Sequence, residues 1–191
     1  PEGTNWTEEA AHRPSNPYSA GKAGAEDYAY AYYITYGLPV FITNTMNVFG
    51  PDQHPEKFIP TVIRKVLSGE TLPVYASADK KKAGSRFWIH VDAVADAIDF
   101  LLGSAREGER YNIVGTEKDN LDLAKQVAKI IGKPLKYEMV DFHSSRPGHD
   151  LRYGLDGHKM KMMGWKLPFT IDEYLKETVE GYCENIQMPN M

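Results

Sequence analysis

Apolar and polar positions change along the chain in a pattern that predicts strands and helices in turn. Short apolar runs rich in branched and aromatic residues, which are typical of buried strands, occur at 39–43, 72–75, 86–90, 110–114 and 136–140. Longer patterned segments predict helices at 18–36, 58–68, 91–102, 120–131, 156–163 and 170–186. Because strands alternate with helices, the pattern predicts an α/β fold.

Local signals set the expected ends of these helices. Asn16 followed by Pro17 predicts an N-cap with proline in the first helical position, and Gly37 ends the same helix. By the same reasoning Asn120 is the expected cap of the helix at 120–131, and Thr170 caps the last helix. On the helix at 91–102 the expected buried face consists of Val94, Ala97, Ile98 and Leu101.

Charge and composition narrow the class of protein. The net charge of the 191 residues is −4, which argues against a nucleic-acid-binding surface, because phosphate binding needs a concentrated basic face. The one basic run, Lys80–Lys82, is interpreted as a solvated hairpin tip. Cys183 is the only cysteine, so no intrachain disulfide forms, and this fits a reducing compartment. No apolar run approaches the ~20 residues that span a bilayer, and the first residues hold no signal-peptide core, so we expect a soluble, cytoplasmic chain.

Tyr18 and Lys22 are the first candidates for chemistry. Positions i and i+4 lie on one face of a helix, so both side chains can point into the same cleft. A phenol titrates near ~10 unaided, and a neighbouring ammonium lowers that pKa, which makes Tyr18 a plausible proton acceptor from a sugar hydroxyl. About one Tyr-x-x-x-Lys match is expected by chance in a chain of this composition, and this chain has one. The six histidines show no spacing typical of metal ligands, so no metal site is expected.

Several longer motifs follow in a fixed order: NPYSAGKAGAEDYAYAYYITYGLPVFITNTMNVFGP, PEKFIP, LPVYA, SRFWIHVDAVADAI, YNIVG and RPGHDLRYGLD. With them the whole chain resembles the second half of the dTDP-glucose 4,6-dehydratases, members of the extended short-chain dehydrogenase/reductase family. RPGHD followed by RY is the most specific part. The helix motif and the NVFGP turn are shared with epimerases and other nucleotide-sugar enzymes.

The resemblance implies roles for individual residues. Tyr18 would be the base that helps NAD to oxidise the sugar, and Lys22 would bind the nicotinamide ribose, so both would also contact the cofactor. The implied contacts to a dTDP-sugar or another nucleotide-sugar come from Asn47, Lys57, Phe58, Pro73, Tyr75, Arg86, Asn112, Arg146, His149 and Tyr153. Guanidinium groups suit phosphate oxygens, and aromatic faces such as Tyr75 can stack on a base.

Three departures from the family pattern lie around the implied nucleotide channel. The usual pair of asparagines is reduced to Asn47-Val48, Phe87 replaces an acidic residue, and the segment ASADKKKAG is longer than the common form. Preference for dTDP over UDP, GDP or CDP therefore stays open.

The resemblance also implies a division of the fold. Residues 1–50 would be a remnant of a Rossmann-like domain, carrying the Tyr-x-x-x-Lys helix and the end of its parallel sheet. Residues 51–191 would be mainly a small α/β nucleotide-sugar-binding subdomain, with a segment at about 84–115 returning to the Rossmann-like sheet.

No Gly-x-Gly-x-x-Gly loop follows a strand in these residues, and the Thr-Asp-Glu motif of the dehydratases is missing. The chain is therefore expected to be the carboxy-terminal half of an NAD-dependent dehydratase, inactive alone and paired with an amino-terminal half. The alternatives are a non-catalytic module that binds nucleotide-sugars or a partner, and part of a related 4-epimerase or decarboxylase. The tyrosine-rich first helix indicates a homodimer surface.

Overall fold

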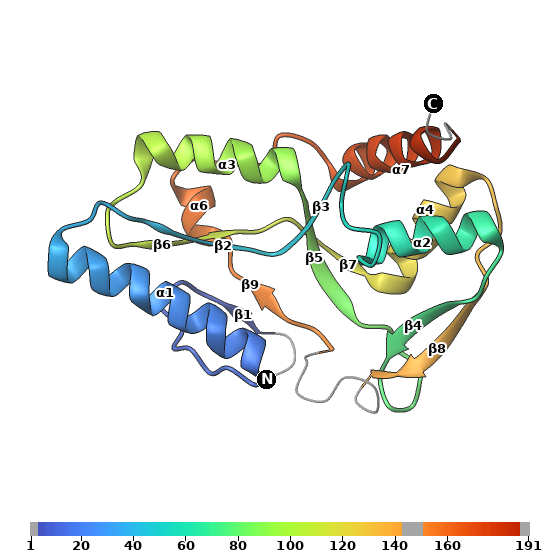
Figure 1. Cartoon of the computed structure of the whole chain (residues 1–191), viewed down its shortest axis with the longest axis horizontal. Helices are drawn as coiled ribbons and strands as arrows, with labels where there is room; N and C mark the ends of the chain where they lie inside the picture. The colour runs from blue at the N-terminus through green and yellow to red at the C-terminus, as the bar shows by residue number, and fades with distance from the viewer. Residues whose placement is uncertain (1–3, 143–150, 188–191) are drawn as a thin grey trace.

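The computed structural model describes residues 4–142 and 151–187 and has the expected α/β organisation (Figure 1). Its helices are α1 (Pro17–Tyr36), α2 (Phe58–Ser68), α3 (Val91–Ser104), α4 (Asn120–Ile131), α6 (His158–Met162) and α7 (Ile171–Gln187). Its strands are β1 (Asn5–Trp6), β2 (Ile42–Thr45), β3 (Asn47–Phe49), β4 (Leu72–Ala76), β5 (Ser85–His90), β6 (Arg110–Ile113), β7 (Thr116–Asp119), β8 (Tyr137–Asp141) and β9 (Gly154–Leu155).

The strands pair mostly in parallel. In the described residues β2 pairs with β6, β3 with β5, β4 with β8 and β1 with β9, all parallel. Only β7 runs antiparallel to its neighbour β5. Figure 1 shows the β2–β6 pair running between α1 on one side and α3 on the other, while α2, α4 and α7 gather at the opposite end near β4 and β8.

The apolar faces of α2, α4 and α7 form much of the core. Spacings of three and four residues place the buried side chains of each helix on one stripe, and these are Ile59, Val62, Ile63 and Val66 on α2, Leu123, Val127 and Ala128 on α4, and Leu175 and Val179 on α7. Burial of each large aliphatic side chain contributes about 1.5–3 kcal/mol. These residues belong to one buried cluster with Trp88 and Ile89 of β5.

Local capping signals set both ends of α1, as predicted. The Asn16 side chain accepts a hydrogen bond from the Ser19 backbone N–H at 2.9 Å, and the Asn16 N–H donates to the Ser19 hydroxyl. Gly37 ends the helix with φ of 66°, in the left-handed region that glycine adopts without strain.

Three of the sequence predictions about elements are wrong. The cap of α4 is Asp119, whose carboxylate accepts from the N–H groups of Leu121 and Asp122, and not Asn120. The face predicted for α3 is right at Ala97 and Leu101, which are buried, and at Val94, which is partly buried against the core, but it is wrong at Ile98, which is exposed. Ala93 is buried in addition. The strand expected at 39–43 begins only at Ile42, because its register follows its pairing with β6 rather than its apolar run.

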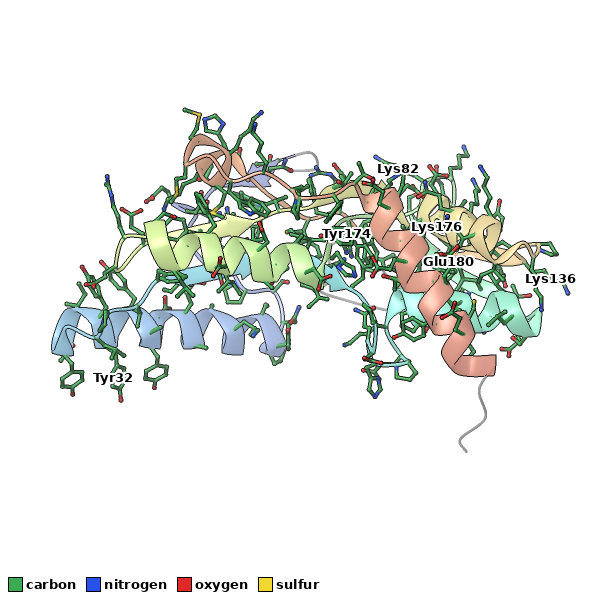
Figure 2. The ribbon with its side chains drawn as sticks, turned by 90° about the horizontal axis from the view of Figure 1, so that it is seen from above. Tyr32, Lys82, Lys136, Tyr174, Lys176 and Glu180 are labelled. Carbon is green, nitrogen blue, oxygen red and sulfur yellow. The ribbon has the colours of Figure 1, made fainter. Side chains whose placement is uncertain are left out.

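Helix α1 is held at few points. It has no buried residue, and the side chains of Tyr28, Tyr32 and Tyr36 are exposed. Figure 2 shows Tyr32 projecting away from the body of the protein. An ion pair between Glu26 of α1 and Arg110 of β6 ties the helix to the sheet. Among the residues that the structure describes, no helix is both long and apolar enough to cross a membrane.

Candidate functional site

A cavity of about 710 Å3 opens where β3, β4, β5 and the start of α2 meet the segment before β9. Seven of the side chains that the sequence implicated in nucleotide-sugar binding line it: Asn47, Lys57, Phe58, Pro73, Tyr75, Arg86 and Tyr153. They come from five separate stretches of the chain, so folding and not sequence proximity gathers them.

Three polar side chains form one wall of the cavity. The Tyr153 hydroxyl donates a hydrogen bond to the Asn47 side-chain oxygen at 2.7 Å. The guanidinium of Arg86 lies over the Tyr153 ring, 4.7 Å from its centroid, which is a favourable cation–π distance. Nη1 of Arg86 also donates to the carbonyl oxygens of Ser85, at 2.7 Å, and Leu151, at 2.6 Å. The Arg86 side chain is thus held in place before any ligand arrives.

Aromatic rings form much of the remaining wall. The ring of Phe58 lies against Trp88 with centroids 5.6 Å apart, and Tyr75 meets Phe142 edge-on at 5.9 Å. All four residues line the cavity. Such faces can take a planar base by stacking.

Lys57 and the dipole of α2 place positive charge at the amino-terminal end of this helix, beside the cavity. Lys57 is the residue before the helix, and no side chain caps the helix there. The free N–H groups and dipole at a helix start favour anions. Lys57 adds a full charge, although Glu56 approaches its ammonium at 3.7 Å and offsets part of it.

Asn112 does not line this cavity, unlike the seven residues above. Asn112 is buried, and its side-chain nitrogen donates to the carbonyl oxygens of Trp6, at 3.0 Å, and Asp156, at 3.1 Å. It therefore fastens β1 and the end of β9 to β6.

A different asparagine, Asn120, lines the cavity. Its side-chain oxygen is buried and accepts no hydrogen bond from the described part of the chain, so a ligand donor would relieve an unsatisfied acceptor. In the sequence, Asn120 stands out only as a possible helix cap, so its place in the cavity was not predicted. Recognition of the short strand β7 just before it would have placed it at a strand end.

Tyr18 and Lys22 lie in the first turns of α1 and are both exposed, Tyr18 by 74%. They are four residues apart on one helix, as the sequence required, but neither lines the cavity described above. Arg146 and His149 lie outside the described residues.

The chain belongs to the NAD dependent epimerase/dehydratase family, whose model matches residues 1–114. Among curated proteins it is 39% identical over 192 residues to a dTDP-glucose 4,6-dehydratase of Salmonella typhimurium, covering 97% of this chain and 52% of that protein. It is 38% identical to the enzyme of the same name from Xanthomonas campestris, over 94% of this chain and 53% of the relative. The chain thus spans about half the length of the curated relatives it matches.

Solved structures agree with this assignment. The chain superimposes on dTDP-glucose 4,6-dehydratase from Bacillus anthracis, in complex with NAD, with a TM-score of 0.86 and 38% identity over 98% of this chain and 58% of the other. The Streptomyces venezuelae enzyme with NAD and TYD bound gives 0.86 and 38%, over 97% and 56%. A UDP-glucose 4-epimerase from Thermus thermophilus in complex with NAD is more distant, at 28% identity and 0.84, over 96% and 59%.

Proposed function

We propose that this chain is the nucleotide-sugar-binding, carboxy-terminal part of an NAD-dependent 4,6-dehydratase that converts dTDP-glucose to a 4-keto-6-deoxy sugar. The observation that carries the proposal is the single cavity in which Arg86, Tyr153 and Asn47 are joined by contacts, with Lys57 and Tyr75 in the same lining. The similarity to dTDP-glucose 4,6-dehydratases over nearly the whole chain supports it.

The cavity offers one set of side chains for a diphosphate and another for a nucleobase. Arg86, Lys57 and the start of α2 supply the positive charge that a diphosphate needs. Tyr75, with Phe142 against it, offers a stacking face for a base. The unpartnered oxygen of Asn120 would accept from a ribose hydroxyl or a base N–H.

Tyr18 and Lys22 would serve the reacting part of the sugar and the cofactor. When bound, NAD supplies the acceptor for the hydride of an alcohol oxidation. The residues fit this group, because Lys22 carries three donors for ribose hydroxyls and is exposed on the same helix as Tyr18, four residues further on. Tyr18 would take the proton of the sugar hydroxyl.

The pairing of strands supports the proposed division of the chain. β2 and β3, which lie in residues 1–50, pair with β6 and β5 of the segment 84–115. We therefore assign 1–50 and 84–115 to the Rossmann-like part, and the rest of 51–191 mainly to the nucleotide-sugar subdomain.

Turnover is expected only when an amino-terminal half is supplied. The test is co-expression of this chain with the first half of a related dTDP-glucose 4,6-dehydratase, followed by an assay of NAD-dependent 4-keto sugar formation from dTDP-glucose. Activity that Tyr18→Phe abolishes supports the proposal. A mixed complex that forms but converts UDP-glucose to UDP-galactose instead would support a 4-epimerase.

A non-catalytic module that binds nucleotide-sugars is the second candidate. The isolated chain is expected to bind dTDP measurably and NAD negligibly. Tight dTDP-sugar binding without activity in any complementation favours the module.

The exposed tyrosines of α1 support an association surface that a second copy or an amino-terminal half covers. Burial of large aromatic faces stabilises such interfaces. Sedimentation of the chain alone, and with the added half, separates the two partners.

A further inference from the structure

The segment 151–154 has two faces with different contacts. Leu151 and Tyr153 line the cavity, whereas Arg152 is absent from its lining. Arg152 forms an isolated parallel bridge with Ser85, so this segment runs beside β5. Successive side chains of an extended chain point to opposite faces. Leu151 and Tyr153 therefore face the cavity, and Arg152 between them faces the rest of the protein.

Arg152 binds three separate parts of the fold. Its Nε and Nη2 donate to the two carboxylate oxygens of Glu117 on β7, at 2.7 and 3.0 Å. Nη2 also donates to the side-chain oxygen of Asn5 on β1 at 3.0 Å, and the guanidinium lies 5.6 Å from the centroid of the Phe87 ring. A bidentate ion pair of this kind fixes the orientation of the Arg152 guanidinium as well as its distance from Glu117.

Further contacts hold the Arg152–Glu117 ion pair and the 151–154 segment in place. The Ser85 hydroxyl donates to the same Glu117 carboxylate at 2.7 Å. Arg152 donates hydrogen bonds that hold the pKa of the Glu117 carboxyl below its ordinary value, so the ion pair persists as the pH falls toward that value. Two residues further on, a Cβ on Gly154 would stand 2.6 Å from both the Asn5 side-chain oxygen and the Phe87 ring, so the chain passes its neighbours closely. Figure 1 shows β9 beside β1 at this point.

We infer that the Arg152–Glu117 ion pair is a positioning device for the ligand cavity: it fixes the 151–154 segment so that Tyr153 stays between Asn47 and Arg86. The inference rests on the proposed nucleotide-sugar function of that cavity. Arg152 touches no ligand in this account and acts through Tyr153 and the Leu151 carbonyl, which is the acceptor of Arg86.

The inference predicts a coupling that a merely stabilising ion pair does not produce. Arg152→Ala is expected to weaken dTDP binding about tenfold, and Arg152→Lys less, because an ammonium keeps the charge but loses the two-pronged geometry. In a Tyr153→Ala background the further effect of Arg152→Ala is expected to fall to about twofold or less, since the residue through which it acts is gone.

The experiment is a calorimetric titration of the 191-residue chain and these variants with dTDP, at a temperature where circular dichroism shows each to be folded. Lys176→Ala is the matched control, because Lys176 forms an exposed ion pair with Glu180 at 3.9 Å on α7, and Figure 2 shows both residues on that helix. The control is expected to change affinity less than twofold. Equal losses from Arg152→Ala with and without Tyr153, or no loss at all, overturn the inference.

Amide hydrogen exchange of peptides covering 151–155 tests, without any ligand, whether Arg152 holds this segment in place. Arg152→Ala is expected to speed exchange there more than in peptides covering α4, and unchanged exchange overturns the inference. If the wild-type chain binds no dTDP, the proposed function of the cavity fails, while the exchange result still decides whether Arg152 positions the segment.

Discussion

The Tyr153 hydroxyl donates a hydrogen bond at 2.7 Å to the side-chain oxygen of Asn47, a residue that precedes it by 106 positions. The bond joins the end of the parallel sheet to the segment before β9, and it stands beside the Arg86 guanidinium. Its removal tests whether the wall of the cavity is one connected unit.

Tyr153→Phe is expected to destabilise the fold by about 0.5–1.5 kcal/mol, the usual net value of one hydrogen bond, and to weaken dTDP binding severalfold. Chemical denaturation and calorimetry measure the two effects. Tyr28→Phe is the control, because Tyr28 is 72% exposed on α1, and it should change neither quantity. Affinity that stays unchanged in Tyr153→Phe would contradict the described wall.

Asn112 and Asn120 should behave differently when each is replaced by alanine. Asn112→Ala removes two hydrogen bonds, to the carbonyl oxygens of Trp6 and Asp156, although the Trp6 carbonyl keeps the Asp156 N–H as a donor at 2.8 Å. Stability should fall by about 1–3 kcal/mol in total, with little direct effect on ligand affinity. Asn120→Ala removes an acceptor that has no partner among residues 4–142 and 151–187, so stability should change little while dTDP affinity falls. Chemical denaturation and calorimetry with dTDP, applied to both variants, check this. A loss of dTDP affinity in Asn112→Ala but not in Asn120→Ala would indicate that Asn112, and not Asn120, belongs to the binding site.

We expect His90 to make the stability of the protein depend on pH. The ring is buried, stacks on Tyr174 with centroids 4.1 Å apart, and its Nε2 has no partner. Burial lowers the pKa of His90 below its ordinary value of 6.5, although Asp92 and Glu177 act in the opposite direction. Above 6.5 the histidine is neutral in both states. Below 6.5 the unfolded state takes up the proton more readily, so stability is lost as the pH falls toward the folded pKa.

His90→Phe should therefore flatten the change in melting temperature between pH 7.5 and 5.5. His54→Gln serves as the control, since the His54 side chain is 68% exposed. Wild-type and His90→Phe curves that fall in parallel through this range would rule out His90 as the cause.

Gly115 occupies a position where even a methyl group has no room. A Cβ there would stand 1.9 Å from the carbonyl oxygen of Trp88 and 2.8 Å from the Ile89 side chain. Gly115→Ala should force β5 and the turn before β7 apart and lower stability by at least about 1–3 kcal/mol, the usual range for overpacking. Gly103→Ala on α3, with nothing within 4 Å, is the matched substitution and should be tolerated. Equal stability of the two variants would argue against the close contact between Gly115 and the Trp88 carbonyl.

The sequence predicted the features that depend on neighbouring residues. The bounds of α2 and the capped start of α1 match the structure because Asn16, Gly37 and Gly69 act locally. Seven of the implied ligand residues share a cavity because they lie at the ends of elements whose order the motifs preserve.

Features that depend on pairing between distant segments were not predictable in the same way. The strand β7 has the polar sequence TEKD, and only its pairing with β5 makes it a strand. Without β7, Asn120 had no reason to be preferred over Asn112. The ion pair between Arg152 and Glu117 likewise joins residues 35 positions apart, and no local pattern indicates it.

A calorimetric titration with dTDP, comparing the wild-type chain with Arg86→Gln, tests the central claim most directly. Arg106→Gln is the control, since its side chain is 85% exposed and lies outside the cavity lining. We expect measurable binding by wild type and control, and a loss of about tenfold or more in Arg86→Gln, because in the proposed site the fixed guanidinium would be the main partner of the diphosphate. Wild-type binding that Arg86→Gln leaves unchanged, or no binding of dTDP at all, would contradict it.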